Sequence, residues 1–483
     1  MFQKVLIANR GEIALRVARA CRELGIPTVA VYSTVDADSA VVRYADEAVR
    51  IGPGPARRSY LSMAAVLEAA RRTGADAIHP GYGFLSEDAY FAEAVAAEGL
   101  TFIGPPPEVI ATLGDKVAAR NAMAAAGVPM LPGSLEPLRT ADEAEEVVDR
   151  IGLPVIIKAA AGGGGRGMTV VHDRAEFARA YRDTVANAQQ LFGDGRVYVE
   201  RYLASARHVE VQILADTHGN VIHLGERDCS AQRRHQKLVE ESPAPGLPDH
   251  VREALGAAAV RGARAAGYVG AGTFEFLYDA SAGEFYFMEV NCRIQVEHPV
   301  TEMVTRVDLV QEQIRVAAGE PLSLRQSDVR THGVSVEARI NVEDPERNFV
   351  PAPGLLEEFV PPGGAFVRVD THGYAGYRVP ADYDSLLAKL VVWAPDREQA
   401  LARLRRALGE FRISGPGVRT TAAFIAELVA DPVFAAGEHS TSIVEDVLAG
   451  REEKVEEIPA PVPFGRRRRA GAVPPPTALP EAA

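Results

Sequence analysis

Residues 155–171 read VIIKAAAGGGGRGMTVV, in which a short apolar run, a glycine-rich loop and a second β-branched run follow one another. The loop Gly162–Gly167 matches the GxGxxG pattern of dinucleotide-binding folds, and it comes within one residue of a Walker A loop, with Met168 in place of the lysine. Both of those loops open into a helix that binds phosphate at its N-terminus. Thr169–Val171 favours a strand instead. The stretch therefore predicts a hairpin that covers nucleotide phosphates, with Lys158 placed to neutralise one of them; a surface loop without a ligand is the alternative.

The chain before this loop alternates short β-branched runs with helical patterns, as in KVLIA (4–8), PTVAVYS (27–33) and LTFIGP (100–105). Strands separated by helices of this length predict βαβ units and a parallel sheet. From about residue 130 onward strands dominate, and a second strand-rich region begins at Val334. We therefore expect a parallel α/β part followed by mixed α+β parts.

The chain has 483 residues, 65 acidic and 52 basic side chains, and a formal net charge of −13. Nucleic-acid coats and membrane-surface binders need a positive field over much of their surface, so this charge argues against both. No apolar run approaches the length of a membrane span, and Cys21, Cys229 and Cys292 form no CxxC pair. We expect a soluble, cytoplasmic protein without disulfides or structural zinc.

The composition changes after Gly450. Residues 459–483 hold seven prolines and the run Arg466–Arg469, with almost no β-branched or aromatic residues. Such a segment cannot bury enough apolar surface to fold. We therefore expect a disordered tail over residues 451–483.

A second hairpin is predicted by residues 272–293, GTFEFLYDASAGEFYFMEVNCR. Two alternating strands flank a turn, and glycine in a three-residue loop, 281–283, would supply the left-handed position. That loop pairs Ala280 with Glu284 and thereby sets the register of the whole hairpin.

The same register places Glu275 opposite Glu289, with Asn291 on the same face. Two opposed carboxylates repel each other unless a cation lies between them. Two carboxylates and an amide oxygen suit Mg²⁺ that is also bound to nucleotide phosphates. The alternative is a pair of exposed glutamates in a slipped register.

Directly after the hairpin, the segment 293–299 (RIQVEHP) brings an arginine, a glutamate and a histidine beside the predicted metal site. The Arg293 guanidinium can bind a small planar anion, towards which Glu297 can act as a base.

Upstream, residues 226–241 form a basic cluster that equally well fits a solvated charge run. HVEVQI (208–213) and SVEARIN (335–341) place polar residues at alternating positions, which any half-buried antiparallel strand does.

Taken together, these motifs resemble the biotin carboxylase family of ATP-grasp enzymes. The resemblance spans about residues 1–450 and rests on KVLIANRGEIALR, HPGYGFLSE, GGGGRGM, HVEVQIL, ERDCSAQRRHQK, EVNCRIQVEHPVTEM and DYDSLLAKL. It implies an N-terminal parallel α/β domain (1–114), an ATP-grasp domain (115–332) with a mobile lid (about 130–203), and a C-terminal mixed domain (333–450).

The resemblance implies ATP-dependent carboxylation of biotin by bicarbonate through a carboxyphosphate intermediate. ATP would be contacted by Lys116, Lys158, Gly164, Gly165, Glu200, Arg201, Tyr202, Leu203, His208 and His235. Mg²⁺ or Mn²⁺ would be held by Glu275, Glu289 and Asn291. Bicarbonate would be held by Lys237, Arg293 and Val296. Glu297 would be the base, and Arg339 would stabilise the biotin enolate.

A biotinyl carrier domain has a lysine between two methionines, and no such tripeptide occurs in this sequence. The resemblance therefore implies a separate biotin carboxyl carrier protein, separate carboxyltransferase subunits and a homodimer of this chain. Acetyl-CoA carboxylase, which acts in fatty acid synthesis, is the expected assembly, and a propionyl-CoA or other acyl-CoA carboxylase is the alternative.

A non-catalytic scaffold subunit and an ATP-grasp ligase that joins a carboxylate to an amine are remoter alternatives. Retention of every catalytic position disfavours the scaffold, and QVEHPVTEM and ERDCSAQRRHQK disfavour the other ligase.

Overall fold

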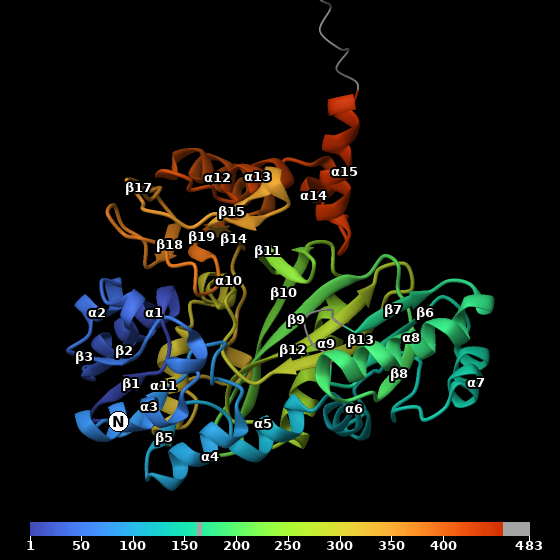
Figure 1. Ribbon diagram of the computed structural model, residues 1–483, viewed down its shortest axis with the longest axis horizontal. Helices are drawn as coiled ribbons and strands as arrows, with labels where there is room; N and C mark the ends of the chain where they lie inside the picture. Colours follow the sequence, from blue (N-terminus) through green and yellow to red (C-terminus); the bar gives the residue numbers. More distant parts are fainter. Residues whose placement is uncertain (162–166, 457–483) are drawn as a thin grey trace, which may run out of the picture.

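The computed structural model describes residues 1–161 and 167–456. Gly164 and Gly165, which the resemblance assigns to ATP, and residues 457–483 of the expected tail lie outside the described residues. Figure 1 shows an N-terminal layer of strands and helices, a large central sheet with a smaller sheet beside it, and a group of C-terminal helices. Within the described ranges, no helix is both long and apolar enough to cross a bilayer.

The N-terminal part is a parallel sheet with helices on both faces. Its five strands lie in the order β3-β2-β1-β4-β5, and every neighbouring pair is parallel. They are β1 (Val5–Ile7), β2 (Thr28–Ser33), β3 (Glu47–Gly52), β4 (Ala77–His79) and β5 (Thr101–Phe102). The helices are α1 (Gly11–Glu23), α2 (Ala40–Tyr44), α3 (Met63–Thr73) and α4 (Ala89–Ala97). Val5 and Ile7 share a core with α1, whereas Leu6 shares one with α3 and α4, so both faces are buried as in other parallel sheets.

The central and C-terminal parts share one antiparallel sheet of eight strands, in the order β13-β12-β9-β10-β11-β14-β19-β18. These strands are β9 (Arg207–Ala215), β10 (Val221–Arg233), β11 (Gln236–Ser242), β12 (Gly270–Asp279), β13 (Glu284–Asn291), β14 (Val334–Asn341), β18 (Val367–Thr371) and β19 (Leu386–Ala394). The expected domain boundary at 332 lies just before β14, which pairs directly with β11. The sheet is therefore continuous across that boundary.

Alternation along the central strands separates an apolar face from a polar one. Val211 of β9 and Phe274 of β12 are buried in the core cluster that α9 (Asp249–Ala265) completes. Their neighbours Glu210 and Glu275 project from the opposite face, since successive side chains of a strand alternate. The polar face of the sheet therefore carries the acidic residues of the candidate site.

The hairpin of β12 and β13 confirms the predicted pairing of Glu275 with Glu289 but corrects its turn. Asp279 pairs with Glu284, so the loop has four residues rather than three, and the expected pairing of Ala280 with Glu284 is wrong. A β-bulge then shifts the register by one residue between Phe276 and Glu275, which restores the expected pair. The two one-residue differences cancel.

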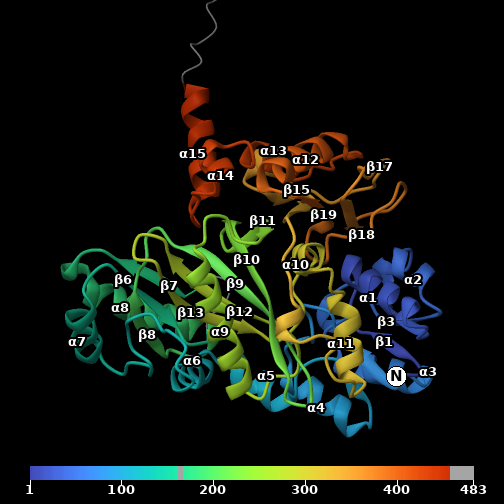
Figure 2. The same ribbon diagram turned by 180° about the vertical axis from the view of Figure 1, so that it is seen from behind.

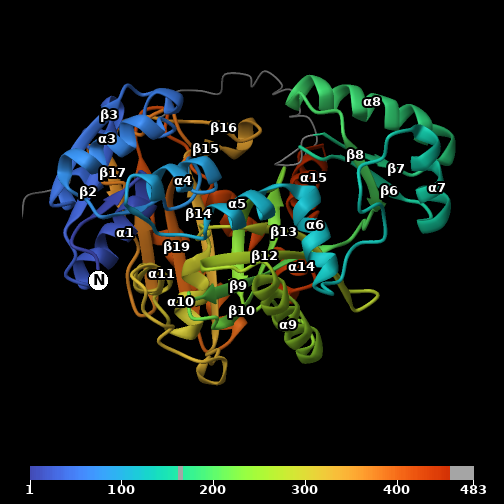
Figure 3. The same cartoon turned by 90° about the horizontal axis from the view of Figure 1, so that it is seen from below.

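A smaller antiparallel sheet lies at the opposite end of the molecule from the N-terminal sheet (Figure 3). It has the order β7-β6-β8 and consists of β6 (Val155–Ala159), β7 (Met168–Val171) and β8 (Val197–Arg201), with α7 (Ala141–Ile151) and α8 (Arg174–Phe192) packed on it. Ile157 pairs with Thr169, so the strand–loop–strand hairpin predicted at the glycine-rich loop is confirmed.

Further helices connect and cover the sheets. They are α5 (Pro107–Gly114), α6 (Lys116–Ala125), α10 (His298–Thr305), α11 (Leu309–Ala317), α12 (Arg397–Glu410), α13 (Ala422–Leu428), α14 (Pro432–Ala436) and α15 (Ile443–Glu456). The short strands are β15 (Glu343–Asp344), β16 (Val350–Pro351), β17 (Glu358–Val360) and β20 (Arg412–Ser414). Figure 2 shows α11 beside the N-terminal sheet, where Ile314 shares a core with Ile13 of α1. α12 and α13 bury Leu404 and Phe424 against β14 and β19.

Helix α15 continues to Glu456 and so extends past residue 450, where we expected the tail to begin. Arg451 explains the extension. Its guanidinium forms an ion pair with Glu427 and lies 4.9 Å from the centroid of the Phe424 ring. These contacts stabilise an additional turn that the composition of the tail did not indicate.

A buried ion-pair cluster connects the three parts of the molecule. Glu302 of α10 lies 2.8 Å from Arg16 of α1 and 2.7 Å from Arg368 of β18. Burial opposes the ionisation of Glu302, but the two guanidinium groups outweigh it and lower its pKa to about 2. Its ionised form therefore stabilises the contact between the parts.

We expect Glu302→Gln to lower the free energy of unfolding by about 3 kcal/mol at neutral pH, since a pKa displaced downward by two to three units is worth about that much. The folded-state pKa lies below the ordinary value of 4.5, so the stabilisation is complete above pH 4.5 and is lost as the pH falls towards 2. Urea unfolding of both proteins across this range measures the difference. A difference that is independent of pH would contradict the assignment.

Candidate active site

Glu297 lies at the centre of the candidate site, at the residue that precedes α10, and it is completely buried. Lys237 Nζ lies 2.6 Å from its Oε1 and Arg339 Nη2 lies 2.9 Å from its Oε2. Although burial opposes ionisation, Lys237 and Arg339 hold the pKa of Glu297 well below its ordinary value. Glu297 is therefore an ionised carboxylate.

Lys237 is shared by three buried carboxylates. Besides Glu297, its ammonium group lies 2.7 Å from Glu210 Oε2 and 3.1 Å from Glu275 Oε1. Three acceptors match the three N–H donors of an ammonium group. Against the effect of burial, the surrounding acidic groups raise the pKa of Lys237 well above its ordinary value. Lys237 therefore stays charged and joins β9, β11, β12 and the start of α10.

A β-bulge brings Lys237 and Glu240 to the same face of β11. Gln232 pairs with Lys237 while the preceding Ala231 pairs with Val239, so one residue of β11 is left over. Without this bulge, residues three positions apart would point to opposite faces. Glu240 Oε1 accepts a hydrogen bond of 2.5 Å from Arg339 Nε. Sequence patterning could not have found Glu240, because the bulge reverses its orientation.

The predicted metal-binding residues come together in the hairpin. Asn291 Nδ2 donates a 2.8 Å hydrogen bond to Glu275 Oε1, and Lys116 Nζ lies 3.6 Å from Glu289 Oε2. Burial and the charge of Glu275 raise the pKa of Glu289. A divalent cation between the two carboxylates would remove this repulsion, and their oxygen ligands are those that Mg²⁺ prefers. The donor set therefore fits the predicted metal.

Arg293 is held in position by residues on two sides. Its Nε lies 2.9 Å from Glu87 Oε2, its Nη2 2.9 Å from Asn291 Oδ1 and its Nη1 2.8 Å from Gln295 Oε1. Glu87 also accepts a 2.9 Å hydrogen bond from the backbone N–H of Cys292. Glu87 belongs to the N-terminal part, so this part closes onto the site. The motif HPGYGFLSE contains Glu87, but the sequence indicated no role for it.

The residues predicted to bind ATP come from both sheets. In the smaller sheet, Lys158 Nζ lies 2.7 Å from Glu200 Oε2, and Arg120 pairs with the other oxygen. Glu200 is buried, so its carboxylate positions Lys158. Arg201, Tyr202 and Leu203 follow it at the end of β8 and beyond.

His208 and His235 lie on the central sheet. His208 Nε2 is 3.1 Å from Glu275 Oε2, beside the predicted metal ligands. His235 occupies the β10–β11 turn in a left-handed conformation with φ 66°. Burial lowers the pKa of His235; the charge of Glu445 opposes this shift, and the charges of His208 and Lys158 add to it.

Val296 is held through its carbonyl group. Lys389 Nζ donates a 2.8 Å hydrogen bond to Val296 O and lies 3.0 Å from Glu12 Oε1, and the lysine is fully buried. An anion requires a donor, so Val296 can bind bicarbonate only through its backbone N–H. Lys389 and Glu12 thus fix the turn that carries Glu297, and neither was singled out from the sequence.

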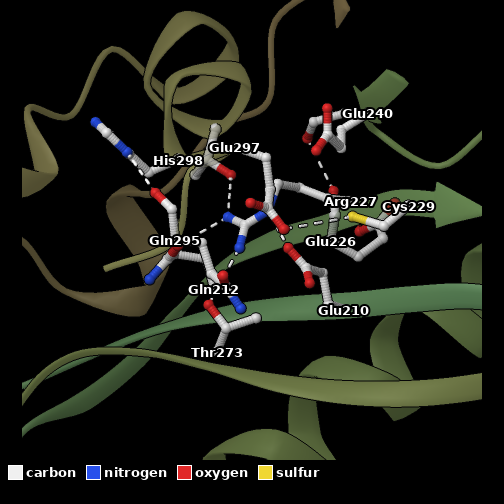
Figure 4. A network of polar contacts seen from close by, with 12 residues as sticks. Glu210, Gln212, Glu226, Arg227, Cys229, Glu240, Thr273, Gln295, Glu297 and His298 are labelled. Carbon is white, nitrogen blue, oxygen red and sulfur yellow. Dashed lines mark hydrogen bonds and ion pairs between the residues drawn. The ribbon is translucent and has the colours of Figure 1, made fainter. Parts of the chain in front are cut away.

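Arg227 lies in the middle of the network of polar side chains that supports the site (Figure 4). Its guanidinium lies 2.6 Å from Glu210 Oε1 and donates hydrogen bonds of 2.7 Å to Gln212 Oε1 and 2.9 Å to Thr301 Oγ1. It is completely buried, and it connects the sheet to α10. Residues 226–241 were open to interpretation as a solvated charge run. Arg227, which belongs to this segment, is instead buried and forms an internal ion pair with Glu210.

Three family models together match most of the chain. Residues 1–110 match "Biotin carboxylase, N-terminal domain", residues 115–325 match "Carbamoyl-phosphate synthase L chain, ATP binding domain", and residues 337–446 match "Biotin carboxylase C-terminal domain". Biotin carboxylase 1 of Bacillus subtilis is 52% identical over 445 residues, which cover 92% of this chain and 98% of that protein.

Solved structures agree with this relationship. A biotin carboxylase from Campylobacter jejuni in a β,γ-ATP complex is 46% identical, with a TM-score of 0.88, and the match covers 92% of this chain and 99% of that one. The biotin carboxylase domain of the 2-oxoglutarate carboxylase of Hydrogenobacter thermophilus is 48% identical, with a TM-score of 0.87 and coverage of 92% and 98%. That structure is a dimer in complex with MgADP, ADP and bicarbonate.

We expect Lys389→Met to lower the free energy of unfolding by about 3–5 kcal/mol, because it leaves the buried carboxylate of Glu12 without its cation. Replacing both partners, as Lys389→Met with Glu12→Gln, removes that uncompensated charge and should cost less than Lys389→Met alone. Urea unfolding followed by circular dichroism measures Lys389→Met, Glu12→Gln and the double variant. If the loss in the double variant equals the sum of the single losses, the two residues are not coupled.

Proposed function

Since the chain belongs to the biotin carboxylase family, whose members are ATP-dependent ligases that carboxylate biotin with bicarbonate, we propose that its buried charge cluster carries out this reaction. The observation that supports this proposal best is the position of Glu297 between Lys237 and Arg339, beside the Glu275–Glu289 pair. One carboxylate there can accept a proton while neighbouring cations hold the anion that forms.

In the first step, bicarbonate binds to Arg293, Lys237 and the backbone N–H of Val296. Its charge draws Lys237 away from Glu297, which raises the basicity of Glu297 until it accepts the bicarbonate proton. The deprotonated oxygen attacks the γ-phosphate of ATP, the bond from that phosphorus to the bridging oxygen breaks, and carboxyphosphate forms as ADP leaves. Lys116 and Lys158 offset the charge of the phosphates. Glu275, Glu289 and Asn291 would hold a divalent cation, which would supply further positive charge at the phosphates.

In the second step, carboxyphosphate yields CO₂ and phosphate, and the phosphate removes the proton from the ureido nitrogen of biotin. Arg339 donates hydrogen bonds to the ureido oxygen, on which negative charge develops. The nitrogen then attacks CO₂. Water would destroy carboxyphosphate, so closure of a lid over the site serves the reaction.

We also propose the remaining assignments. Gly164, Gly165, Glu200–Leu203, His208 and His235 contact ATP. The domains are 1–114, 115–332 with a lid at about 130–203, and 333–450. Support for the lid comes from the small sheet, which is joined to the central sheet at its edge and carries Lys158 on the strand before the glycine-rich loop.

For the assembly, we propose a cytoplasmic homodimer that carboxylates biotin on a separate carrier protein and works with carboxyltransferase subunits. The dimer of the Hydrogenobacter relative supports the homodimer. Acetyl-CoA carboxylase is the favoured assembly, and another acyl-CoA carboxylase is the alternative. The final carboxyl acceptor binds the carboxyltransferase, so the site of this chain is compatible with either.

We expect Glu297→Gln to lower turnover by about 10²–10⁴-fold, the usual contribution of a general base, while ATP binding persists. The assay is phosphate release from ATP with and without bicarbonate and biotin. Glu241→Gln is the matched control, because Glu241 is also buried and paired with an arginine, Arg397, but does not contact Glu297. Unimpaired turnover in Glu297→Gln would exclude it as the base, and a wild-type chain without bicarbonate-dependent release would refute the proposed function.

We expect Glu289→Gln to raise the Mg²⁺ concentration that gives half-maximal activity by about tenfold or more, since one of two anionic ligands is lost. Binding of Mn²⁺ in the presence of ADP, followed by electron paramagnetic resonance, should weaken in parallel. Glu284→Gln at the exposed start of the same strand is the control. Equal metal titrations of both variants would contradict the role of Glu289.

A further inference from the structure

Two buried glutamates face each other beneath Arg339. In the β11–β14 ladder, Glu240 pairs directly with Glu337, and both side chains have no exposed surface. Directly opposite residues of an antiparallel pair have Cβ atoms only about 5 Å apart. Within the described residues, Glu240 Oε2 and both carboxyl oxygens of Glu337 have no hydrogen-bond donor. The mechanism outlined above gives neither residue a role.

The positive charge around this pair is insufficient for two carboxylates. Arg339 is the cation that touches Glu240, and it also serves Glu297 at 2.9 Å. Lys237, on the same face of β11, is shared by three other carboxylates. Lys389, on the neighbouring β19, is paired with Glu12. Two opposed carboxylates in a site that excludes water cannot both remain ionised.

We propose that Glu240 and Glu337 share a single proton, with Glu240 ionised and Glu337 protonated, and that this pair positions Arg339 for the biotin half of the reaction. The inference rests on the proposed function of Arg339. The hydrogen bond from Arg339 Nε stabilises the ionised form of Glu240. Burial raises the pKa of both carboxyl groups, but the charge and hydrogen bond of Arg339 oppose that rise for Glu240, whereas the charge of Glu240 adds to it for Glu337, so the proton resides on Glu337.

This arrangement gives Arg339 one permanent partner and one exchangeable partner. When Glu297 accepts the bicarbonate proton, it loses the charge that holds Arg339 Nη2. Glu240 still pairs with both Nε and Nη2, so the guanidinium stays on the sheet, while the N–H of Nη2 that Glu297 released can donate to the ureido oxygen of biotin. The neutral state of Glu337 matters for the same reason, because a second fixed negative charge would compete with the developing enolate for Arg339.

Infrared difference spectroscopy of the full-length protein tests the shared proton without turnover. The C=O stretching band of a protonated carboxyl should be lost in Glu337→Gln. It should also be lost in Glu240→Gln, since Glu337 then ionises against Arg339. The double variant should lose no more than either single variant, and Glu241→Gln, in which an arginine-paired carboxylate on the same strand is changed, should lose nothing. An unchanged band in Glu337→Gln would overturn the shared proton.

Kinetics test the positioning of Arg339. Glu240→Gln should lower kcat/KM for free biotin by about 10- to 100-fold, the range expected when one hydrogen bond to a charged group is lost. Bicarbonate-dependent ATP hydrolysis without biotin should stay close to that of Glu241→Gln, because Glu240 does not contact the ATP or bicarbonate residues. Glu337→Gln should keep biotin turnover, since glutamine mimics the neutral acid.

The outcomes separate this inference from the proposed function. Equal losses of both activities in Glu240→Gln would show a general structural role and overturn the positioning. A wild-type chain that hydrolyses ATP without any response to bicarbonate would instead refute the proposed function. If Glu240→Gln fails to fold, the infrared band of Glu337→Gln still decides whether the proton is shared.

Discussion

The hydrogen-bonded pairing of β11 with β14 is the constraint on which the candidate site depends. It places Lys237 and Glu240 on one strand next to Arg339 and Glu337 on the other, at the point where Glu297 enters from α10. Burying charged side chains between these strands costs free energy, and they remain ionised only if each has a well-placed partner of opposite charge. The ladder supplies that placement, because paired strands fix their facing side chains within about 5 Å. In the reaction that we propose, an incoming bicarbonate anion changes which carboxylates these cations contact.

Contacts from the N-terminal part complete the site. Glu87 holds Arg293, Glu12 holds Lys389 and thereby the Val296 carbonyl, and Arg16 joins Glu302. Each of these residues lies far in sequence from its partner; the ion pairs Glu12–Lys389 and Arg16–Glu302 are buried, whereas Glu87 is exposed. A shift of the N-terminal part would therefore disturb the orientation of the arginine and of the turn that presents Glu297. The parallel sheet acts as a support for the chemistry carried by the antiparallel one.

How far the site could be predicted differs from residue to residue. Period-2 alternation and turn composition correctly placed Glu275 opposite Glu289, yet the turn was one residue longer than expected, and a bulge compensated for it. The second bulge lies in β11 and changes which face Glu240 occupies. No other irregularity offset this change, so the sequence pattern did not identify Glu240. Bulges are set by the twist and neighbours of a strand, so local patterns do not reveal them. Arg227 was open to misreading because charge alone does not indicate burial.

The sequence by itself determined the family, the alternation of strands and helices, the glycine-loop hairpin and the residue types that ATP, a metal and bicarbonate require. These features follow from short segments of the sequence or from recognisable motifs, so they can be predicted without the three-dimensional structure. Only the tertiary structure decided that the central and C-terminal parts share one sheet, that Lys237 serves three carboxylates, and that Glu240 faces Glu337 beneath Arg339. The physical reason is that burial and charge pairing depend on which distant strands meet, and the energy of a carboxylate is set by those neighbours.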